Sequence, residues 1–311
     1  ENMTLTLLDG GLGQELVARS ARQPNGLWSA QVMIDSPDLV QMVHRDYFLA
    51  GADVATTNSY AIHRDRLQRY GLEEMFADLH RQACQLAASA RDEHGHGQVA
   101  GSLGPIGGSF RPERAPSVEQ AAELYAEIAL LQEPYVDVIL CEAMASVEQA
   151  RGAVMGACVG SKPVWLAVTV DDDDGTRLRS GEPLVDVLPL LEEFKLEALL
   201  VNCSTPEAID QAIPLLVDQS RSIGAYANGF VKINEDFLAD NATVEVLEKR
   251  SNLGPAAYAD FVEGWIHQNV TIVGGCCEVG PAHIYELARR LKKPVGTGEN
   301  LAGVRQPHQG Q

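Results

Sequence analysis

Short apolar runs recur along the chain, and each one stops at a glycine or a polar residue. Runs of this kind, rich in β-branched residues, are typical of parallel strands that are buried on both faces. The pattern predicts eight strands, at residues 5–8, 53–58, 99–102, 136–142, 164–170, 198–203, 224–228 and 270–274.

Helical patterns separate these strands. Between Ser36 and Gly51, apolar residues recur at helical spacing behind an N-cap serine and a first-turn proline. Similar signals predict helices that begin near residues 14, 72, 117, 146, 205 and 280. Residues 229–254 have the least regular pattern, so we expect a long excursion there, after the seventh strand.

Strands that alternate with helices imply a parallel sheet with right-handed crossovers. Eight such units predict an α/β fold, a single closed (β/α)₈ TIM barrel. No linker-like segment divides the chain, so we expect one barrel domain over residues 3–296. The tail, residues 297–311, contains many Gly, Pro, Gln and His residues, and we expect it to be flexible.

The composition narrows the class of protein. Of the 311 residues, 45% are hydrophobic and 22% are charged, which is typical of a soluble globular chain. The formal net charge of -19 argues against binding to nucleic acid or to an anionic membrane surface. No signal-like segment opens the sequence, and no apolar run reaches the roughly 18 residues of a membrane span. We therefore expect a cytoplasmic protein, and we exclude Glu1 and Asn2, ahead of Met3, from the fold.

Cysteines at two predicted strand ends give the strongest chemical signal. The chain has six cysteines, widely spaced, and we expect no disulfide framework. Cys203 ends the sixth strand, and Cys276 and Cys277 follow the eighth. Three thiolates beside one open position are a typical catalytic zinc site, and soft ligands select zinc over magnesium or calcium. The alternative is that these are ordinary buried cysteines. Cys84 and Cys158, in or near helical patterns, are expected to be core or surface residues. Cys141 precedes Glu142 on its strand, so if Glu142 points into the barrel mouth, Cys141 points toward the helices.

Other polar residues stand at the same strand ends, where the active sites of barrels lie. Asp9 and Glu142 could receive an ammonium group, and the backbone amides around Gly10 and Gly11 could receive a carboxylate. The pattern predicts an amino-acid pocket beside a thiophilic metal. The expected substrate-binding residues are Asp9, Gly10, Gly11, Thr57, Asn58, Glu142 and Asn202. No histidine pair has metal-ligand spacing, so each histidine is interpreted as structural or exposed.

With these residues, the chain resembles the homocysteine S-methyltransferases. The resemblance covers nearly the whole chain, and its most specific part combines Asn202-Cys203 with the glycine pair before Cys276-Cys277. The other matching segments are residues 8–16, 52–60, 101–105 and 174–178. The resemblance implies a (β/α)₈ barrel, a catalytic zinc ion on Cys203, Cys276 and Cys277, and homocysteine as methyl acceptor. It also implies that Asp9 and Glu142 lie near the amino group of the substrate.

Two loops depart from the family pattern. Residues 278–281 read Glu-Val-Gly-Pro where the family often has Thr-Thr-Pro, and residues 143–146 read Ala-Met-Ala-Ser in place of the commoner Thr-Ile-Pro-Ser. Both loops border the expected pocket, so they bear on the choice of donor and acceptor.

The sequence thus predicts a zinc-dependent enzyme of methionine biosynthesis. It would move a methyl group from a small onium donor to the thiolate of homocysteine. S-methylmethionine or S-adenosylmethionine is the preferred donor, with betaine as the alternative, and selenocysteine is an alternative acceptor. The rival hypothesis is a non-catalytic protein whose three cysteines store zinc or cycle between thiol and disulfide. The sequence makes no prediction of the oligomeric state.

Overall fold

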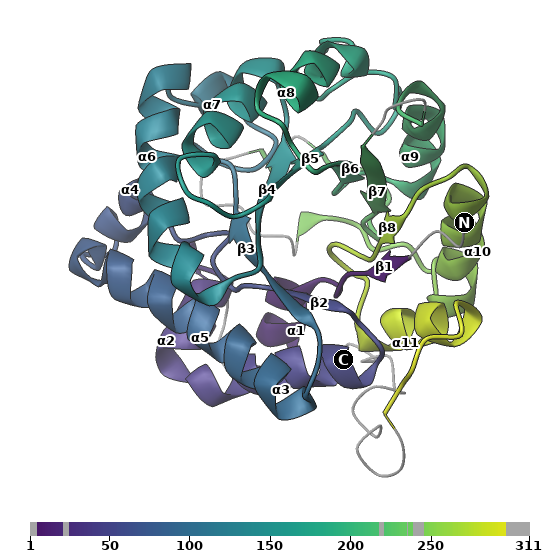
Figure 1. Ribbon diagram of the computed structural model, residues 1–311, viewed down its shortest axis with the longest axis horizontal. Coiled ribbons are helices and arrows are strands. Elements are labelled where there is room, and N and C mark those ends of the chain that lie inside the picture. The colour runs from purple at the N-terminus through teal and green to yellow at the C-terminus, as the bar shows by residue number, and fades with distance from the viewer. Residues whose placement is uncertain (1–4, 21–24, 218–220, 235, 239–245, 297–311) are drawn as a thin grey trace.

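Eight parallel strands surround a central axis, and helices cover the outside of the sheet (Figure 1). The computed structural model describes residues 5–20, 25–217, 221–234, 236–238 and 246–296. Within these residues the chain alternates between strand and helix, as the sequence predicts for a (β/α)₈ barrel.

The strands follow one another around the barrel, in the order β1-β8-β7-β6-β5-β4-β3-β2. A parallel bridge between Leu8 and Val54 brings β1 beside β2 and completes the ring. The strand bounds are β1 (Thr6–Leu7), β2 (Val54–Thr56), β3 (Gln98–Leu103), β4 (Val138–Met144), β5 (Val164–Val168), β6 (Ala198–Asn202), β7 (Ser222–Tyr226) and β8 (Ile272–Val273). Each lies within or beside a predicted run.

The α-helices in the described residues are α1 (Leu12–Arg19), α2 (Ser29–Asp35), α3 (Pro37–Leu49), α4 (Arg64–Gln68), α5 (Phe76–His94), α6 (Val118–Gln132), α7 (Val147–Ala157), α8 (Leu188–Glu193), α9 (Pro206–Ala212), α10 (Pro255–His267) and α11 (Pro281–Arg290). Short 3₁₀ turns lie at Glu73–Met75, Pro112–Arg114, Glu133–Tyr135, Leu184–Val187 and Ile213–Leu215.

Three of the predicted N-caps form. The side chains of Ser117, Ser146 and Thr205 each accept a hydrogen bond from the backbone N–H three residues later, at 3.1–3.3 Å. Ser36 precedes α3 as predicted, but its side chain makes no capping hydrogen bond. Each predicted helix is present, whereas α2 and α4 do not stand out in the sequence because they are short.

The predicted excursion after β7 starts and ends as a paired ribbon. Phe230 and Lys249 form an antiparallel bridge, and hydrogen bonds join Val231 to Glu248 and Arg250 to Gly229. The predicted flexible tail, residues 297–311, lies outside the described residues.

Two layers of apolar side chains hold the barrel together. The inner layer fills the barrel with residues such as Leu140, Leu200 and Trp165. The outer layer lies between the strands and the helices, and it contains Cys141, which agrees with the prediction that this residue points toward the helices. In both layers, folding removes large apolar areas from contact with water, which is the main favourable term in folding.

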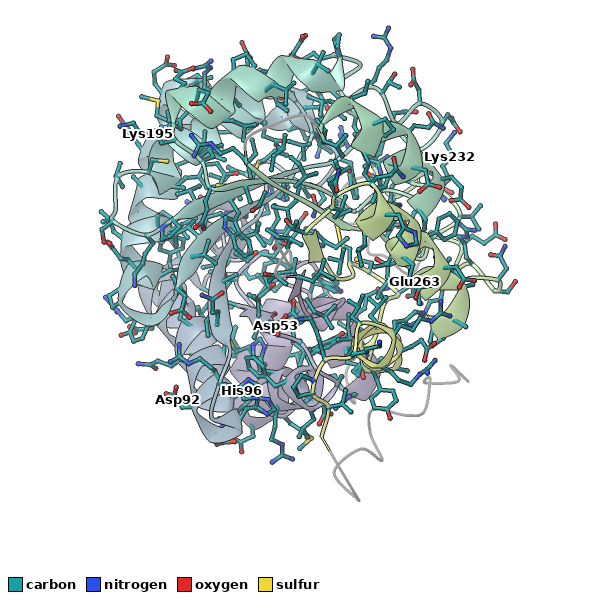
Figure 2. The ribbon with its side chains drawn as sticks, turned by 45° about the vertical axis from the view of Figure 1, so that its right-hand side comes forward. Asp53, Asp92, His96, Lys195, Lys232 and Glu263 are labelled. Carbon is teal, nitrogen blue, oxygen red and sulfur yellow. A yellow bond between two sulfur atoms is a disulfide. The ribbon has the colours of Figure 1, made fainter. Side chains whose placement is uncertain are left out.

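Charged side chains such as Asp92, Lys195 and Lys232 are exposed and project from the periphery (Figure 2). None of the helices in the described part of the chain is both long and apolar enough to span a bilayer.

Candidate active site

A cavity of about 250 Å³ opens at the carboxyl ends of the strands. Its inner walls come from residues in or directly after β1, β2, β4, β6, β7 and β8. Parallel strands carry these residues to one mouth of the barrel, although they lie far apart in the sequence.

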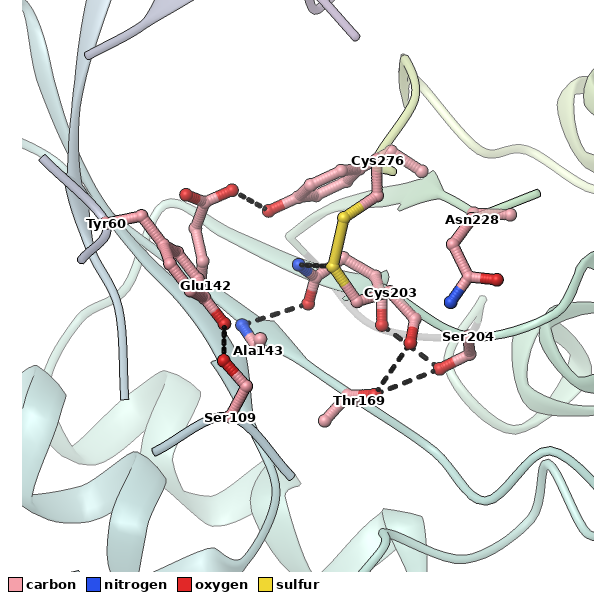
Figure 3. Close-up of a disulfide and its surroundings, with 12 residues drawn as sticks. Tyr60, Ser109, Glu142, Ala143, Thr169, Cys203, Ser204, Asn228 and Cys276 are labelled. Atoms are coloured by element: carbon pink, nitrogen blue, oxygen red, sulfur yellow. Dashed lines mark hydrogen bonds between the residues drawn. A yellow bond between two sulfur atoms is a disulfide. The ribbon is translucent and has the colours of Figure 1, made fainter. Parts of the chain in front are cut away.

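The three cysteines predicted as metal ligands all line this cavity. Cys203 and Cys276 are joined by a disulfide, with their Cα atoms 5.7 Å apart, and Cys277 has a free thiol (Figure 3). The sequence indicated no disulfide framework, and the pair that does form lies at the predicted metal site. Burial raises the pKa of the Cys277 thiol to about 12, so this thiol is protonated at neutral pH in the metal-free protein.

The backbone around Cys203 is held in an unusual conformation. Cys203 has a φ of +49°, in the left-handed region that residues with a side chain rarely adopt. Its carbonyl accepts hydrogen bonds from the Thr169 hydroxyl at 3.2 Å and from the Arg179 guanidinium at 3.0 Å. Left-handed residues also follow Glu142 and Cys277, at Ala143 (+55°) and Glu278 (+65°). Backbone strain of this kind often accompanies functional sites.

A buried ion pair supports this conformation from behind. The guanidinium of Arg179 makes two hydrogen bonds of 3.1 Å to the carboxylate of Asp172. The same carboxylate accepts the backbone N–H groups of Thr205 and Ile233, at 3.0 Å each. One ion pair therefore connects the loops that follow β5, β6 and β7.

Asp9 lies at the inner end of the cavity and is only 3% exposed. Its carboxylate accepts two hydrogen bonds from Thr56, one from the backbone N–H at 2.7 Å and one from the hydroxyl at 2.9 Å. Burial outweighs these hydrogen bonds and raises the pKa of Asp9 to about 8.

Glu142 is the second buried acid, at 8% exposure. It accepts hydrogen bonds from the Ser102 hydroxyl at 2.5 Å and from the Tyr226 hydroxyl at 2.8 Å, the latter drawn in Figure 3. Burial also raises the pKa of Glu142. No lysine or arginine in the described residues pairs with Asp9 or Glu142. Two buried acids that share a cavity without a cation favour a cationic ligand.

Gly10 and Gly11, in the first loop, are closely packed by another part of the backbone, and this packing requires glycine at both positions. A Cβ on Gly10 would lie 2.0 Å from the Val279 carbonyl oxygen, and one on Gly11 would lie 2.6 Å from that of Cys276. The N–H of Gly11 donates to Val279. Both glycines line the cavity, but they are small because the loop after β8 packs against them.

The other predicted substrate-binding residues divide into two groups. Thr57 and Asn58 line the cavity. The Thr57 hydroxyl accepts from the Ser102 N–H and bonds to Ser59, while the Asn58 amide donates to the Ser29 carbonyl. Asn202 is fully buried behind the cavity wall, where its side chain accepts from the Ala143 N–H at 3.0 Å and donates to the Cys203 sulfur at 3.4 Å. Asn202 therefore lies where it supports Cys203 from behind and does not reach the cavity.

The outer half of the cavity contains residues that the sequence did not single out. Tyr60, His63 and Arg66 lie there, from α4 and the turn before it, together with Phe110. The sequence predicts that every histidine is structural or exposed, whereas His63 lines the cavity. A helix of only five residues leaves no recognisable sequence pattern, so the sequence gives no signal for the residues in and around α4.

The metal-binding capacity of the site depends on its oxidation state. In the described residues, no group of three His, Cys, Asp or Glu side chains is arranged to hold a metal ion. A disulfide sulfur carries no thiolate charge, so Cys203 and Cys276 cannot act as ligands in this state. After reduction, three thiols from two strand ends would line one cavity, which is a donor set that fits zinc.

Comparisons with known proteins place these observations in a family. A family model described as homocysteine S-methyltransferase matches residues 6–291. The chain is 28% identical to the homocysteine S-methyltransferase YbgG of Bacillus subtilis, over 91% of this chain and 93% of the relative. It is 25% identical to the selenocysteine Se-methyltransferase of Brassica oleracea, over 92% of this chain and 88% of that one.

Solved structures agree. The metallated form of the homocysteine methyltransferase MmuM from Escherichia coli superposes with a TM-score of 0.78, at 27% identity, covering 93% of this chain and 97% of that one. The oxidized form of the same protein superposes with a TM-score of 0.77, covering 92% and 96%.

Proposed function

The chain belongs to the homocysteine S-methyltransferase family, and from that premise we propose zinc-dependent methyl transfer from a small onium donor to homocysteine. The observation that supports the proposal best is the meeting of three cysteines and two buried acids in one cavity. S-methylmethionine or S-adenosylmethionine is the preferred donor, and betaine is the alternative.

The acids account for the amino group of the acceptor. Asp9 and Glu142 are both held by hydrogen-bond donors, and neither has a protein cation beside it in the described residues. An ammonium group would supply the missing positive charge and favour the ionised form of both acids. Thr56, Ser102 and Tyr226 orient the two carboxylates and so fix where that ammonium binds.

The cysteines account for the sulfur of the acceptor. Cys203, Cys276 and Cys277 are the residues that would hold zinc once the disulfide is reduced. Bound zinc would act as a soft Lewis acid and keep the sulfur of homocysteine as a thiolate. Asn202, Thr169 and Arg179 hold Cys203 in its left-handed conformation, ready to act as a ligand.

The chemistry of the transfer itself is simple. The acceptor sulfur attacks the methyl carbon of the donor, so a new C–S bond forms as the bond to the onium atom breaks. The electron pair of the broken bond stays on the sulfur or nitrogen of the donor, which loses its positive charge as the demethylated donor leaves. The protein contributes orientation and exclusion of water, which the enclosed walls of the cavity provide.

Specific observations favour two alternatives to this proposal, one for the acceptor and one for the function as a whole. Selenocysteine is the acceptor named for the Brassica relative, and the same donor set suits a selenolate. The Cys203–Cys276 disulfide favours the rival hypothesis, a protein that cycles between thiol and disulfide without transferring methyl groups.

One experiment separates these hypotheses. The protein is reduced, loaded with zinc and incubated with homocysteine or selenocysteine and each donor in turn, and the methylated product, methionine or Se-methylselenocysteine, is measured. We expect methionine with at least one donor, and X-ray absorption should show one more sulfur neighbour of zinc when homocysteine is added. If no donor yields methionine and the sulfur count stays fixed in folded, zinc-loaded protein, the methyltransferase proposal fails.

A further inference from the structure

One wall of the outer half of the cavity is formed by α4 and the turn that precedes it. His63 precedes the helix and Arg66 lies within it, and both line the cavity. Residues three apart on a helical turn face the same way. The two side chains therefore present a common surface to whatever binds in the outer half of the cavity.

Arg66 differs from the other arginines of this segment. Arg64 pairs with Glu73 and Glu127, and Arg69 pairs with Asp65. Arg66 has neither an acidic partner nor a hydrogen-bond acceptor in the described residues. Burial lowers the pKa of Arg66, which means that its charge is held at a cost in free energy. An anion bound in the cavity would offset this cost by pairing with the guanidinium.

His63 supplies a second donor at the same wall. It is 5% exposed, and neither of its ring nitrogens makes a well-aligned hydrogen bond in the described residues, although the ring interacts with the backbone of Tyr60. Burial lowers the pKa of His63 to about 3, so the ring is neutral and keeps one N–H donor and one acceptor nitrogen. Because His63 also lines the cavity, a ligand bound there can supply the hydrogen bond that its ring lacks.

The cavity is therefore polarised from end to end. Tyr60 also lines the cavity, and its hydroxyl forms a 2.8 Å hydrogen bond with the Ser109 hydroxyl. The inner end carries acids and suits an ammonium group. The outer end carries the guanidinium of Arg66 and the neutral imidazole of His63. The cavity lining also includes Asp65 and three further arginines, Arg69, Arg111 and Arg114, so positive charge is in excess away from the acids and suits an anion.

We propose that Arg66 and His63 bind the carboxylate of the methyl donor, so that this chain accepts onium donors that carry a carboxylate and discriminates against those that lack one. The inference rests on the proposed function and adds a determinant of donor specificity. Guanidinium groups bind carboxylates through paired, charge-assisted hydrogen bonds, which lysine and neutral donors reproduce only in part.

The test compares two donors that differ only in the carboxylate. S-methylmethionine and its carboxamide are assayed with reduced, zinc-loaded protein, and kcat and KM are measured for each. We expect wild-type protein to prefer the carboxylate donor by roughly 10- to 100-fold in kcat/KM, mainly through KM. Arg66→Gln should abolish most of this preference by weakening the carboxylate donor alone, His63→Leu should reduce it less, and Arg66→Lys should restore part of it.

The controls separate a direct contact from a general effect of charge. Arg64→Gln removes a positive charge of the same helix that already has acidic partners and does not line the cavity, and it should preserve the preference. The KM for homocysteine should be unchanged in Arg66→Gln, which also reports that the variant is folded. A preference that survives Arg66→Gln, or an equal loss in Arg64→Gln, overturns the inference while methyl transfer itself stands. If wild-type protein uses neither donor nor any other onium compound, the proposed function fails and the inference falls with it.

Discussion

The hydroxyl of Tyr226 donates a 2.8 Å hydrogen bond to the carboxylate of Glu142, between residues that lie 84 positions apart in the sequence. Tyr226 ends β7 and Glu142 lies in β4, so the bond runs across the mouth of the barrel. It stabilises the ionised form of a buried acid, which is the form that an ammonium group needs.

Replacing Tyr226 by phenylalanine should therefore weaken the binding of homocysteine. Loss of one hydrogen bond to a charged group costs roughly 1.5–3 kcal/mol, so the KM for homocysteine should rise at least about tenfold. Steady-state kinetics with saturating donor would measure it. Glu142→Gln should shift the KM in the same direction while leaving zinc content intact. An unchanged KM in both variants would show that neither residue serves the acceptor.

Zinc binding should depend on the oxidation state of the protein. Reduced protein should bind about one zinc per chain, because three thiols then line one cavity, whereas protein with the Cys203–Cys276 disulfide should bind none. Metal analysis after gel filtration would measure the content. Cys277→Ala should lower it strongly, while Cys158→Ala, a half-buried cysteine outside the cavity, is the matched control. Equal zinc in both variants would refute the assignment.

The ion pair between Arg179 and Asp172 should be important for stability. Their side chains are only 9% and 3% exposed, so Arg179→Met leaves a buried carboxylate without its cation and should cost about 3–5 kcal/mol. Denaturant unfolding of Arg179→Met, Asp172→Asn and the double variant would give the coupling energy. The exposed pair Arg81–Asp78 is the control, and its loss should cost less than about 1 kcal/mol. Strictly additive effects at Arg179 and Asp172 would contradict this view.

His44 should make stability depend on pH. It is fully buried in α3, its ring nitrogens have no partner in the described residues, and burial lowers its pKa from 6.5 to about 4. The unfolded chain therefore binds a proton more tightly than the folded chain does. The corresponding stability is present above pH 6.5 and is lost as the pH falls toward 4, by roughly 3 kcal/mol.

Unfolding free energies measured between pH 4 and pH 7 would test this. The decline should be shallower for His44→Leu than for wild-type protein, and unaltered for His267→Gln, a change at an exposed histidine. Parallel curves for wild type and His44→Leu would exclude His44 as the source.

The inner half of the site could be predicted because its residues adjoin the strands. Asp9, Glu142 and the three cysteines each lie in or just after an apolar run, and a parallel barrel brings such positions together. The outer half could not. His63 lies just before a five-residue helix and Arg66 lies within it. What singles them out is that the buried ring of His63 makes no well-aligned hydrogen bond and that Arg66 forms no ion pair in the described residues, and such properties come from three-dimensional packing.

Packing adds to two of the predictions for a similar reason. Gly10 and Gly11 are expected to offer backbone amides to a ligand. Both line the cavity, and the backbone after β8 also fills the space that a Cβ would need. Asn202 read as a substrate contact, and it faces Ala143 and Cys203 behind the wall. In both cases a neighbour that is distant in the sequence decides the packing, the loop after β8 for the glycines and Ala143 for Asn202, and a local pattern cannot show such a contact.

The closure of the barrel constrains how this protein can change. The ring closes where Leu8 meets Val54, and the Asp9 carboxylate fastens that seam by accepting both hydrogen bonds of Thr56. The two oxygens that join the closing strands are therefore the same two that we propose bind the ammonium group of the acceptor. Arg66 forms no ion pair in the described residues. If both proposals hold, substitutions on the outer wall can change the donor without disturbing the closure of the barrel, whereas a substitution of Asp9 that suits an acceptor without an ammonium group would also weaken that closure.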